Sequence, residues 1–438
     1  MHIGLAMVFS HFITAASASD FHVWAPTPPM GWNSWDCFGT TVTEEQVKQQ
    51  ADFMAGNLKS HGWQYIVVDI QWYEPESRGH EYRKGAKLTM DEFGRLVPAP
   101  AKFPSAADGQ GFKPLADYVH SLGLKFGIHM MRGIPRQAVQ QNTPIKGTDA
   151  HAAEIADTNN VCAWNPDMFG VDMSKPGAQD YYDSVIALVA SWGVDFIKVD
   201  DLSRPYHQPE IEAIRKAIEK TSRPIVFSTS PGATPVASGA HIDQHANMWR
   251  ISDDFWDSWP LLRSQFKRVN DWTPYRISGA WPDADMLPLG IVRFHEKTRF
   301  TPDEQTTLLT LWCIARSPLM FGGDMTRMDG FTSSLLTNDE VLAVDQHSEN
   351  NRQLFRTGDG LVAWVADAPH SIVKYLAVFN LQDVSKAVVP VNLADLGFAG
   401  EVQVRDLWQG KDLMSVRDKF APDVAAHGAR LFLLKPIK

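Results

Sequence analysis

Cysteine is scarce in this chain, with only Cys37, Cys162 and Cys313 among its 438 residues. The three are far apart, they form no Cys-x-x-Cys pair, and no His-x-His spacing accompanies them. Closely spaced ligands of these kinds are what most zinc sites and redox motifs contain. The sequence therefore predicts neither a disulfide framework nor a metal site.

Positive charge and long apolar stretches are also in short supply. Lys and Arg total 41 against 51 Asp and Glu, which gives a net charge of −10 and leaves no basic patch for a nucleic acid. No apolar run reaches the roughly 18 residues that a membrane-spanning helix needs. We therefore expect neither a nucleic acid nor a membrane among the partners of this protein.

The N-terminal residues resemble an export signal. An apolar stretch over 3–16 runs into Ala16-Ser17-Ala18, which has the small-residue pattern of a signal-peptide cleavage site. The stretch is preceded by His2 and by no Lys or Arg, so a start site assigned too far upstream is the alternative. We predict a signal peptide over 1–18 and a secreted or periplasmic protein.

Short apolar runs alternate with helical patterns over roughly 300 residues. The runs are 65–70, 124–130, 196–200, 224–230, 248–252 and 317–323. They are nearly continuous in apolar residues, as strands buried on both faces must be. The alternation favours a (β/α)8 barrel over 25–345, although these runs supply only six or seven of its strands. An open doubly wound sheet is the alternative, but no Gly-x-Gly-x-x-Gly follows the first run to support it.

Capping residues mark several of the helices between these runs. Thr43 and Gln46 have capping-box spacing ahead of a helix over 44–60. Thr301 precedes a proline and a capping-box acid, which predicts a helix to about 316. Further helical patterns cover 114–122, 178–192 and 210–220.

The last part of the chain has a different pattern. Segments such as "LVAWVAD" (361–367), "KYLAVFNL" (374–381) and "ARLFLLKP" (429–436) are short β patterns separated by turn residues. Several short strands in series are typical of an antiparallel sandwich. We predict a small antiparallel β-sandwich domain over 346–438, and we find no chemistry in it.

Acidic residues follow the predicted strands repeatedly. Asp69, Asp200, Asp253, Asp254, Asp283 and Asp285 lie at or just after such segments, and His129 ends another. The carboxyl ends of barrel strands meet at one mouth, where the chemistry of this fold takes place. Any one acid could be a helix N-cap, but caps do not explain Lys198, which alternation places on the same side as Asp200. A lysine there can hold Asp200 ionised, whereas Asp201 has the opposite parity and is the better cap or outer-face residue.

Facing carboxyl groups are the machinery of glycoside hydrolysis. One protonates the leaving oxygen, and the other acts as nucleophile or base. A two-metal hydrolase also gathers carboxylates, but clustered histidine ligands would be expected with them. The acids at the strand ends therefore favour a glycosidase.

Six segments, in order along the chain, carry a family resemblance. They are "PPMGWNSWDCFG" (28–39), "YIVVDIQWY" (65–73), "LGLKFGIHMMRG" (122–133), "DFIKVDD" (195–201), "MWRISDDFWDSW" (248–259) and "WPDADMLPLG" (281–290). Together they resemble glycoside hydrolase family 27, the α-galactosidase family. The resemblance implies a (β/α)8 barrel with a C-terminal antiparallel β domain, a retaining mechanism, and no metal or organic cofactor.

The resemblance also implies roles, residue by residue. Asp200 matches the family nucleophile, and Lys198 matches the lysine before it. Asp254 matches the acid/base, because the family pattern runs Trp-Arg, three residues, then Asp, and 249–254 fits it. Asp253 is one residue early and is expected to be a bystander. Substrate-pocket positions are matched by Trp35, Asp69, Trp72, Arg250 and Asp285.

One departure from the family bears on the sugar itself. α-Galactosidases carry a second aspartate after the one matched by Asp69, where it holds hydroxyls at the C4/C6 end of galactose, but this chain has Ile70. Isoleucine accepts no hydrogen bond and crowds a hydroxymethyl group, and a buried unpaired hydroxyl costs about 1–3 kcal/mol. β-L-Arabinopyranosides share the ring stereochemistry but lack C6, and some family members that resemble this sequence at "VVDIQW" are β-L-arabinopyranosidases. We expect Ile70 to favour arabinopyranosides, with a loop rearrangement that serves C6 as the alternative.

Three further positions depart from the family pattern. His129 replaces a tyrosine, Ser230 stands where a glutamate is frequent, and Leu202 replaces a cysteine, which removes a disulfide. We expect His129 to bind the nucleophile or a sugar hydroxyl, with a structural role as the alternative. Ser230 is counted among the substrate-binding residues.

The expected activity is release of terminal α-D-galactopyranosyl or β-L-arabinopyranosyl residues by double displacement. The expected partners are galactose- or arabinose-containing oligosaccharides or side chains of plant polysaccharides. The alternatives are a strict α-galactosidase, a hydrolase of isomalto-oligosaccharides and a non-catalytic carbohydrate-binding protein. The last would fit a chain lacking Asp200 or Asp254, and both are present.

Overall fold

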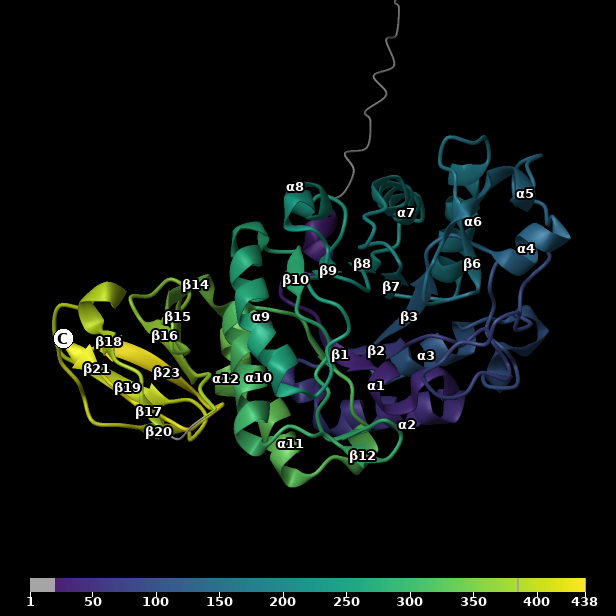
Figure 1. Ribbon diagram of the computed structural model, residues 1–438. Coiled ribbons are helices and arrows are strands. Elements are labelled where there is room, and N and C mark those ends of the chain that lie inside the picture. Colours follow the sequence, from purple (N-terminus) through teal and green to yellow (C-terminus); the bar gives the residue numbers. More distant parts are fainter. Residues whose placement is uncertain (1–19, 384–385, 438) are drawn as a thin grey trace, which may run out of the picture.

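A closed barrel of eight parallel strands forms the larger part of the molecule (Figure 1). The computed structural model describes residues 20–383 and 386–437, so the signal peptide predicted over 1–18 lies outside the described residues. The strands are β1 (Met30–Asn33), β2 (Tyr65–Val68), β3 (Lys125–Met131), β7 (Phe196–Asp200), β8 (Val226–Thr229), β9 (Met248–Arg250), β10 (Trp281–Asp283) and β13 (Leu319–Phe321). They pair in the order β10-β9-β8-β7-β3-β2-β1-β13. A parallel bridge between Leu287 and Phe321 closes the ring between β10 and β13. The predicted (β/α)8 barrel is confirmed.

Helices follow most of these strands and cover the outside of the barrel (Figure 1). They include α2 (Glu44–Asn57), α3 (Lys113–Ser121), α6 (Ala178–Ser191), α7 (Gln208–Lys220), α9 (Trp259–Trp272) and α10 (Pro302–Ala315). The two predicted capping boxes are present, from Thr43 with Gln46 and from Thr301 with Glu304. Over the described residues, no helix combines the length and the apolar character that crossing a bilayer requires.

The inside of the barrel explains where the polar site lies. A separate apolar cluster fills it, made of Tyr65, Val67, Phe196, Val226, Met248, Trp281, Met286 and Met320 together with Ala25. Strand side chains alternate between faces, so the inward parity of these residues continues to positions two and four further along. Those positions are Asp69 just after β2, Lys198 and Asp200 on β7, Ser228 on β8 and Ser230 just after it, Arg250 on β9, and Asp283 on β10 with Asp285 just after it. The packed interior therefore ends in a polar layer at the carboxyl end of the barrel.

Two strands of the barrel were missed as strands in the sequence. β1 has four residues and β10 has three, and both lie inside motifs rich in Trp, Pro and Gly. Gly31 shows why β1 departs from the apolar pattern, because a Cβ there would lie 2.6 Å from the Cβ of Tyr65. The glycine allows β1 and β2 to pair at that point.

A β domain follows the barrel (Figure 1, yellow). Its main antiparallel sheet contains β14 (Glu349–Arg356), β15 (Leu361–Asp367), β16 (Lys374–Asn380), β23 (Ala429–Pro436), β19 (Val402–Asp406) and β20 (Lys411–Asp412). The pairs β17 (Ala387–Val388) with β22 (Asp423–Val424) and β18 (Val391–Asn392) with β21 (Lys419–Phe420) complete it. One face of the main sheet has its own apolar core. The other face packs on α9 and α10, where the ring centroids of Phe379 and Phe266 lie 4.9 Å apart. The predicted C-terminal antiparallel domain is thereby confirmed as a fold.

Candidate active site

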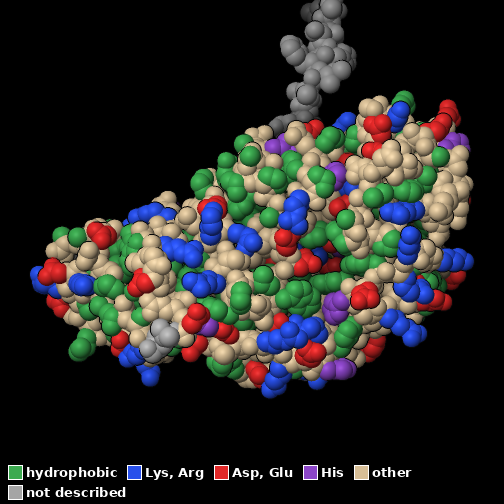
Figure 2. Space-filling model, viewed as in Figure 1, with side chains coloured by type: hydrophobic (Ala, Val, Ile, Leu, Met, Phe, Trp, Pro, Cys, Tyr) green, Lys and Arg blue, Asp and Glu red, His purple; other side chains and the backbone are tan. Residues whose placement is uncertain are grey.

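A cavity of about 590 Å³ opens at the carboxyl end of the barrel strands. Figure 2 shows acidic side chains gathered in a hollow near the middle of the face in view. Most of the predicted site residues line this cavity: Trp35, Asp69, Ile70, Lys198, Asp200, Arg250, Asp254 and Asp285. These residues lie on five of the eight strands or in the loops that follow them, and they meet in one place, as the carboxyl end of this fold requires.

Asp200 ends β7 and is held by two basic groups. Lys198 Nζ lies 3.7 Å from its Oδ1, and His129 Nε2 lies 3.0 Å from its Oδ2. Burial alone would raise the pKa of Asp200, but Lys198, His129 and Arg250 outweigh it and hold the pKa below its usual range. Asp200 is therefore an ionised carboxylate in the cavity at neutral pH.

Asp69, at the end of β2, is fixed by its neighbours before any ligand arrives. Its Oδ2 accepts hydrogen bonds from Asn33 Nδ2 at 2.7 Å and from Lys198 Nζ at 2.9 Å. Its Oδ1 accepts from the backbone amide of Ile70 at 2.8 Å. Lys198 thus joins Asp69 to Asp200, and its pKa is raised because these carboxylates outweigh the effect of burial.

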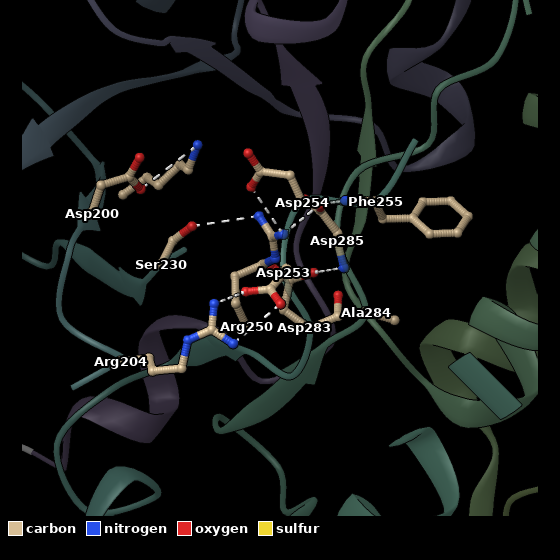
Figure 3. A network of polar contacts seen from close by, with 12 residues as sticks. Asp200, Arg204, Ser230, Arg250, Asp253, Asp254, Phe255, Asp283, Ala284 and Asp285 are labelled. Carbon is tan, nitrogen blue, oxygen red and sulfur yellow. Dashed lines mark hydrogen bonds and ion pairs between the residues drawn. The ribbon is translucent and has the colours of Figure 1, made fainter. Parts of the chain in front are cut away.

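Arg250 organises the opposite side of the cavity (Figure 3). Its Nη2 lies 2.5 Å from Asp285 Oδ2 and 3.3 Å from Asp254 Oδ1, and its Nη1 lies 3.5 Å from Ser230 Oγ. Asp285 also accepts from the backbone amide of Phe255 at 2.7 Å. One guanidinium therefore positions two carboxyl groups that come from different loops.

Asp200 and Asp254 lie on two sides of one open space (Figure 3). Their surroundings differ, because the side chain of Asp200 is 6% exposed and that of Asp254 is 54% exposed. Asp200 contacts Lys198 and His129, whereas Asp254 contacts Arg250 at the more open side. The cavity thus contains one buried, permanently ionised carboxylate and one carboxyl that solvent reaches.

Three predicted residues lie behind the cavity surface. Trp72 is buried, its Nε1 donates to the carbonyl of His129 at 2.8 Å, and its ring packs against Phe112 and Trp192. The expectation that Trp72 contacts substrate is therefore corrected: its side chain packs in the wall of the cavity, against Phe112 and Trp192. His129 and Ser230 are fully buried and reach the cavity only through Asp200 and Arg250.

The two aspartates next to the proposed catalytic pair have other partners, and Asp201 lies on the face that alternation predicts. Asp201 faces away from Asp200 and pairs with Arg132 at 2.7 Å in a buried cluster that includes Glu210. Asp253 pairs with Arg204 at 2.6 Å on the exposed rim of the cavity.

Sequence reasoning missed several cavity residues. Asp36 lines the cavity and is 3% exposed, and a signal was available because it directly follows Trp35 in the first motif. An aromatic rim was also missed, comprising His80, Tyr82, Trp164 and Trp256. The ring of Tyr82 stacks on Trp35 with the ring centroids 6.2 Å apart, and its centroid lies 5.6 Å from that of Trp164. His80, Tyr82 and Trp164 come from loops without strand or helix signals, whereas Trp256 lies within the motif over 248–259, which was a signal that could have found it.

One group of side chains with metal-ligating atoms was also missed, and it lies outside the cavity. Glu212 on α7 meets His241 on α8 (Gly239–Ile242) and His245, which have a His-x-x-x-His spacing. The two imidazoles stack with centroids 4.1 Å apart and planes 16° apart. Their in-plane lone pairs therefore run side by side instead of converging on one point, and we assign no ion to this group.

Known protein families and proteins match most of this chain. The family model "Alpha galactosidase A" matches residues 27–175 and 169–347, and the model "Alpha galactosidase C-terminal beta sandwich domain" matches residues 358–434. The α-galactosidase of Cyamopsis tetragonoloba is 30% identical over 422 residues, which are 94% of this chain and 86% of that protein.

Solved structures are also similar over nearly the whole chain. A family 27 β-L-arabinopyranosidase from Geobacillus stearothermophilus superposes with a TM-score of 0.93 at 52% identity, covering 95% of this chain and 98% of the other. A putative α-N-acetylgalactosaminidase from Bacillus halodurans C-125 has a TM-score of 0.85 at 47% identity, covering 94% and 97%. The chain belongs to the α-galactosidase family of glycoside hydrolases, family 27.

Proposed function

We propose that this glycoside hydrolase releases terminal β-L-arabinopyranosyl residues, and equivalent α-D-galactopyranosyl residues more slowly, by double displacement. Asp200 is the nucleophile and Asp254 is the acid/base. The observation that carries this assignment is that two carboxyl groups line one cavity, one buried beside Lys198 and His129 and the other largely open to solvent. Such a division between two carboxyl groups is what separates nucleophile from acid in glycosidases.

In the first step Asp200 attacks the anomeric carbon while Asp254 gives its proton to the leaving oxygen. The bond to the aglycone breaks, and an ester forms between Asp200 and the sugar. In the second step Asp254, now a base, takes a proton from water as the water attacks the anomeric carbon. The ester breaks, Asp200 is released as a carboxylate, and the sugar leaves with its original anomeric configuration.

The neighbouring groups fit these two roles. Lys198 keeps Asp200 ionised and ready to attack, because its ammonium lies 3.7 Å away in a buried site. Arg250 fixes the position of Asp254 while leaving its other oxygen open to the leaving group and to water. Asp69 and Asp285 are already held by amides and cations, so their remaining lone pairs are oriented toward sugar hydroxyls.

The preference between the two sugars rests on Ile70. Its side chain is 1% exposed and lines the cavity next to Asp69. A hydroxymethyl group at this position would contact an apolar side chain in space that is already filled. A pyranose without C6 has no hydroxyl there that needs a hydrogen bond. The similarity to a β-L-arabinopyranosidase, one structure of which is a complex with arabinose, supports this preference.

The substrates that we propose are oligosaccharides or plant polysaccharide side chains that end in arabinopyranose or galactose. The cavity closes at the polar layer above the barrel interior, so one terminal residue enters and the remainder faces the aromatic rim. Export, as the N-terminal sequence predicts, would bring the enzyme to such extracellular glycans.

Two measurements test the proposal together. 4-Nitrophenyl β-L-arabinopyranoside and α-D-galactopyranoside are assayed side by side, and NMR follows the anomer that forms first from the better substrate. We expect hydrolysis of both, a higher kcat/KM for the arabinopyranoside, and retention of configuration. Inversion, or release of no sugar from either compound, would overturn the mechanism.

A further inference from the structure

The cavity contains one carboxyl group that the catalytic roles leave unused. Asp36 lies on the short helix α1 (Trp35–Phe38), directly after β1, and its side chain lines the cavity. The residue is 3% exposed, and its Oδ2 has no hydrogen-bond partner among the described residues. Every other carboxyl group in the buried part of this cavity has a cation, an amide or a side-chain amide as its partner.

A buried carboxyl group without a partner is expensive to keep. Removing a polar group from water without a hydrogen bond costs more than the net gain from a typical internal one. Burial and the nearby carboxylates of Asp285 and Asp254 raise the pKa of Asp36 well above its usual range, which favours the neutral form of this group. A neutral carboxyl can donate one hydrogen bond and accept another, which is what a sugar hydroxyl requires.

The chain also leaves room for this side chain. Gly322 follows β13, the neighbour of β1 in the barrel, and a Cβ at Gly322 would lie 2.0 Å from Asp36 Oδ2. Any other residue at 322 would displace the carboxyl group. A glycine that makes room for the unpartnered carboxyl group indicates that the fold holds Asp36 in a defined position.

The topology says which part of a sugar this position faces. β1 and β13 lie across the ring from β7, which carries Asp200 and therefore the anomeric carbon. In a pyranose ring, C4 lies opposite C1; C3 and C5 are the next farthest atoms, and of these two only C3 carries a hydroxyl in an arabinopyranose. We propose that Asp36 is a substrate-positioning residue that hydrogen-bonds the hydroxyl on C3 or C4 of the terminal sugar, an inference that rests on the proposed function.

The test combines variants of Asp36 with substrates that lack one hydroxyl. Wild type, Asp36→Ala and Asp36→Asn are assayed on 4-nitrophenyl β-L-arabinopyranoside and on its 2-deoxy, 3-deoxy and 4-deoxy forms. We expect Asp36→Ala to lower kcat/KM about 10- to 100-fold on the parent compound, as the loss of one buried hydrogen bond predicts. The loss should nearly vanish on the 3-deoxy or the 4-deoxy compound, and it should persist on the 2-deoxy compound. Asp36→Asn should recover part of the activity.

Two further variants distinguish a direct contact between Asp36 and the substrate from a general effect on the fold. Gly322→Ala keeps the carboxyl group but displaces it, so it should show the same selective loss as Asp36→Ala. Cys37→Ala changes the next residue of α1, which is buried in the apolar core, and should give no such dependence on the substrate hydroxyls. The melting temperature of each variant shows whether it folds.

The outcomes separate this inference from the proposed function. If the wild type does not release arabinose from the parent compound, the proposed function fails first. If the wild type is active and Asp36→Ala stays within twofold of it, the inference is wrong. The inference is also wrong if Asp36→Ala loses the same factor on all four compounds.

Discussion

Lys198 and Asp200 lie on the same face of β7, with the ammonium nitrogen 3.7 Å from one carboxylate oxygen inside a buried cavity. Burying two charged residues at the end of an otherwise apolar strand would carry a large desolvation cost if the two charges were not paired with each other. As a pair, joined through Lys198 to Asp69 as well, they give a carboxylate that stays ionised without water. This pair is the basis of the nucleophile assignment.

The first prediction concerns this pair. Lys198→Met removes the main cation that lowers the pKa of Asp200, so that pKa should rise and the acid limb of the kcat/KM profile should move to higher pH. Activity should also fall at every pH, because Lys198 orients Asp69. A pH profile of kcat/KM measures both effects. Lys198→Arg keeps the charge and should leave the acid limb near its wild-type position; an unmoved limb in Lys198→Met would contradict this role.

The acid/base assignment predicts a dependence on the leaving group. Asp254→Ala should lower kcat/KM by roughly 10²–10⁴-fold on an alkyl or sugar glycoside, because general acid catalysis contributes about that much. The loss should be much smaller on a 2,4-dinitrophenyl glycoside, whose leaving group needs no proton. Azide should speed the variant and give a glycosyl azide with retained configuration. Equal losses for good and poor leaving groups would count against Asp254.

Ile70 predicts a change of sugar preference. Ile70→Asp supplies an acceptor for the C6 hydroxyl, so the ratio of kcat/KM for the α-galactoside over the β-L-arabinopyranoside should rise roughly 10- to 100-fold. Ile70→Val trims the same side chain without adding an acceptor and should change the ratio only slightly. The two chromogenic glycosides measure the ratio directly. A ratio unaffected by Ile70→Asp would show that another part of the cavity sets the preference.

A buried acid far from the cavity gives a prediction about stability. Asp345 on α12 (Asp339–His347) is fully buried, and burial raises its pKa well above the usual range despite Arg316. Because the pKa of Asp345 is higher in the folded state, its contribution to the free energy of unfolding is fully present below the unfolded pKa of about 4. This contribution is lost as pH rises. The side chain of Asp345→Asn cannot ionise, so the variant does not lose this stability. The melting temperature of the variant minus that of the wild type should therefore increase from pH 4 to pH 8. Asp108→Asn, at an exposed position, should show no such trend; a flat difference for Asp345→Asn would refute the explanation.

Much of the architecture could be predicted from the sequence, because it depends on local patterns. The apolar runs at β2, β3, β7 and β8 were found since parallel strands are buried on both faces and read as continuous. The helices that Thr43 and Thr301 cap were found because capping boxes are local. β1 and β10 were missed because three or four residues with a glycine or proline carry no period.

The site divides in the same way. Asp200 and Lys198 could be placed by alternation, since parity along one strand is a local property. Trp72 was wrongly placed on the cavity surface, because its orientation depends on the packing of Phe112 and Trp192 from other segments. The place of Asp36 after Trp35 in the first motif was a signal for the cavity, but its contact with Gly322, nearly 300 residues away in the chain, appears only in the closed barrel.

A covalent trap tests the central claim most directly. A 2-deoxy-2-fluoro-β-L-arabinopyranosyl fluoride has a good leaving group and a slow second step, so the sugar ester should accumulate on the nucleophile. We predict that peptide mass spectrometry finds the added sugar on Asp200. A sugar attached to Asp254 or to another residue, or a fully inactivated enzyme without any covalent sugar, would contradict the account.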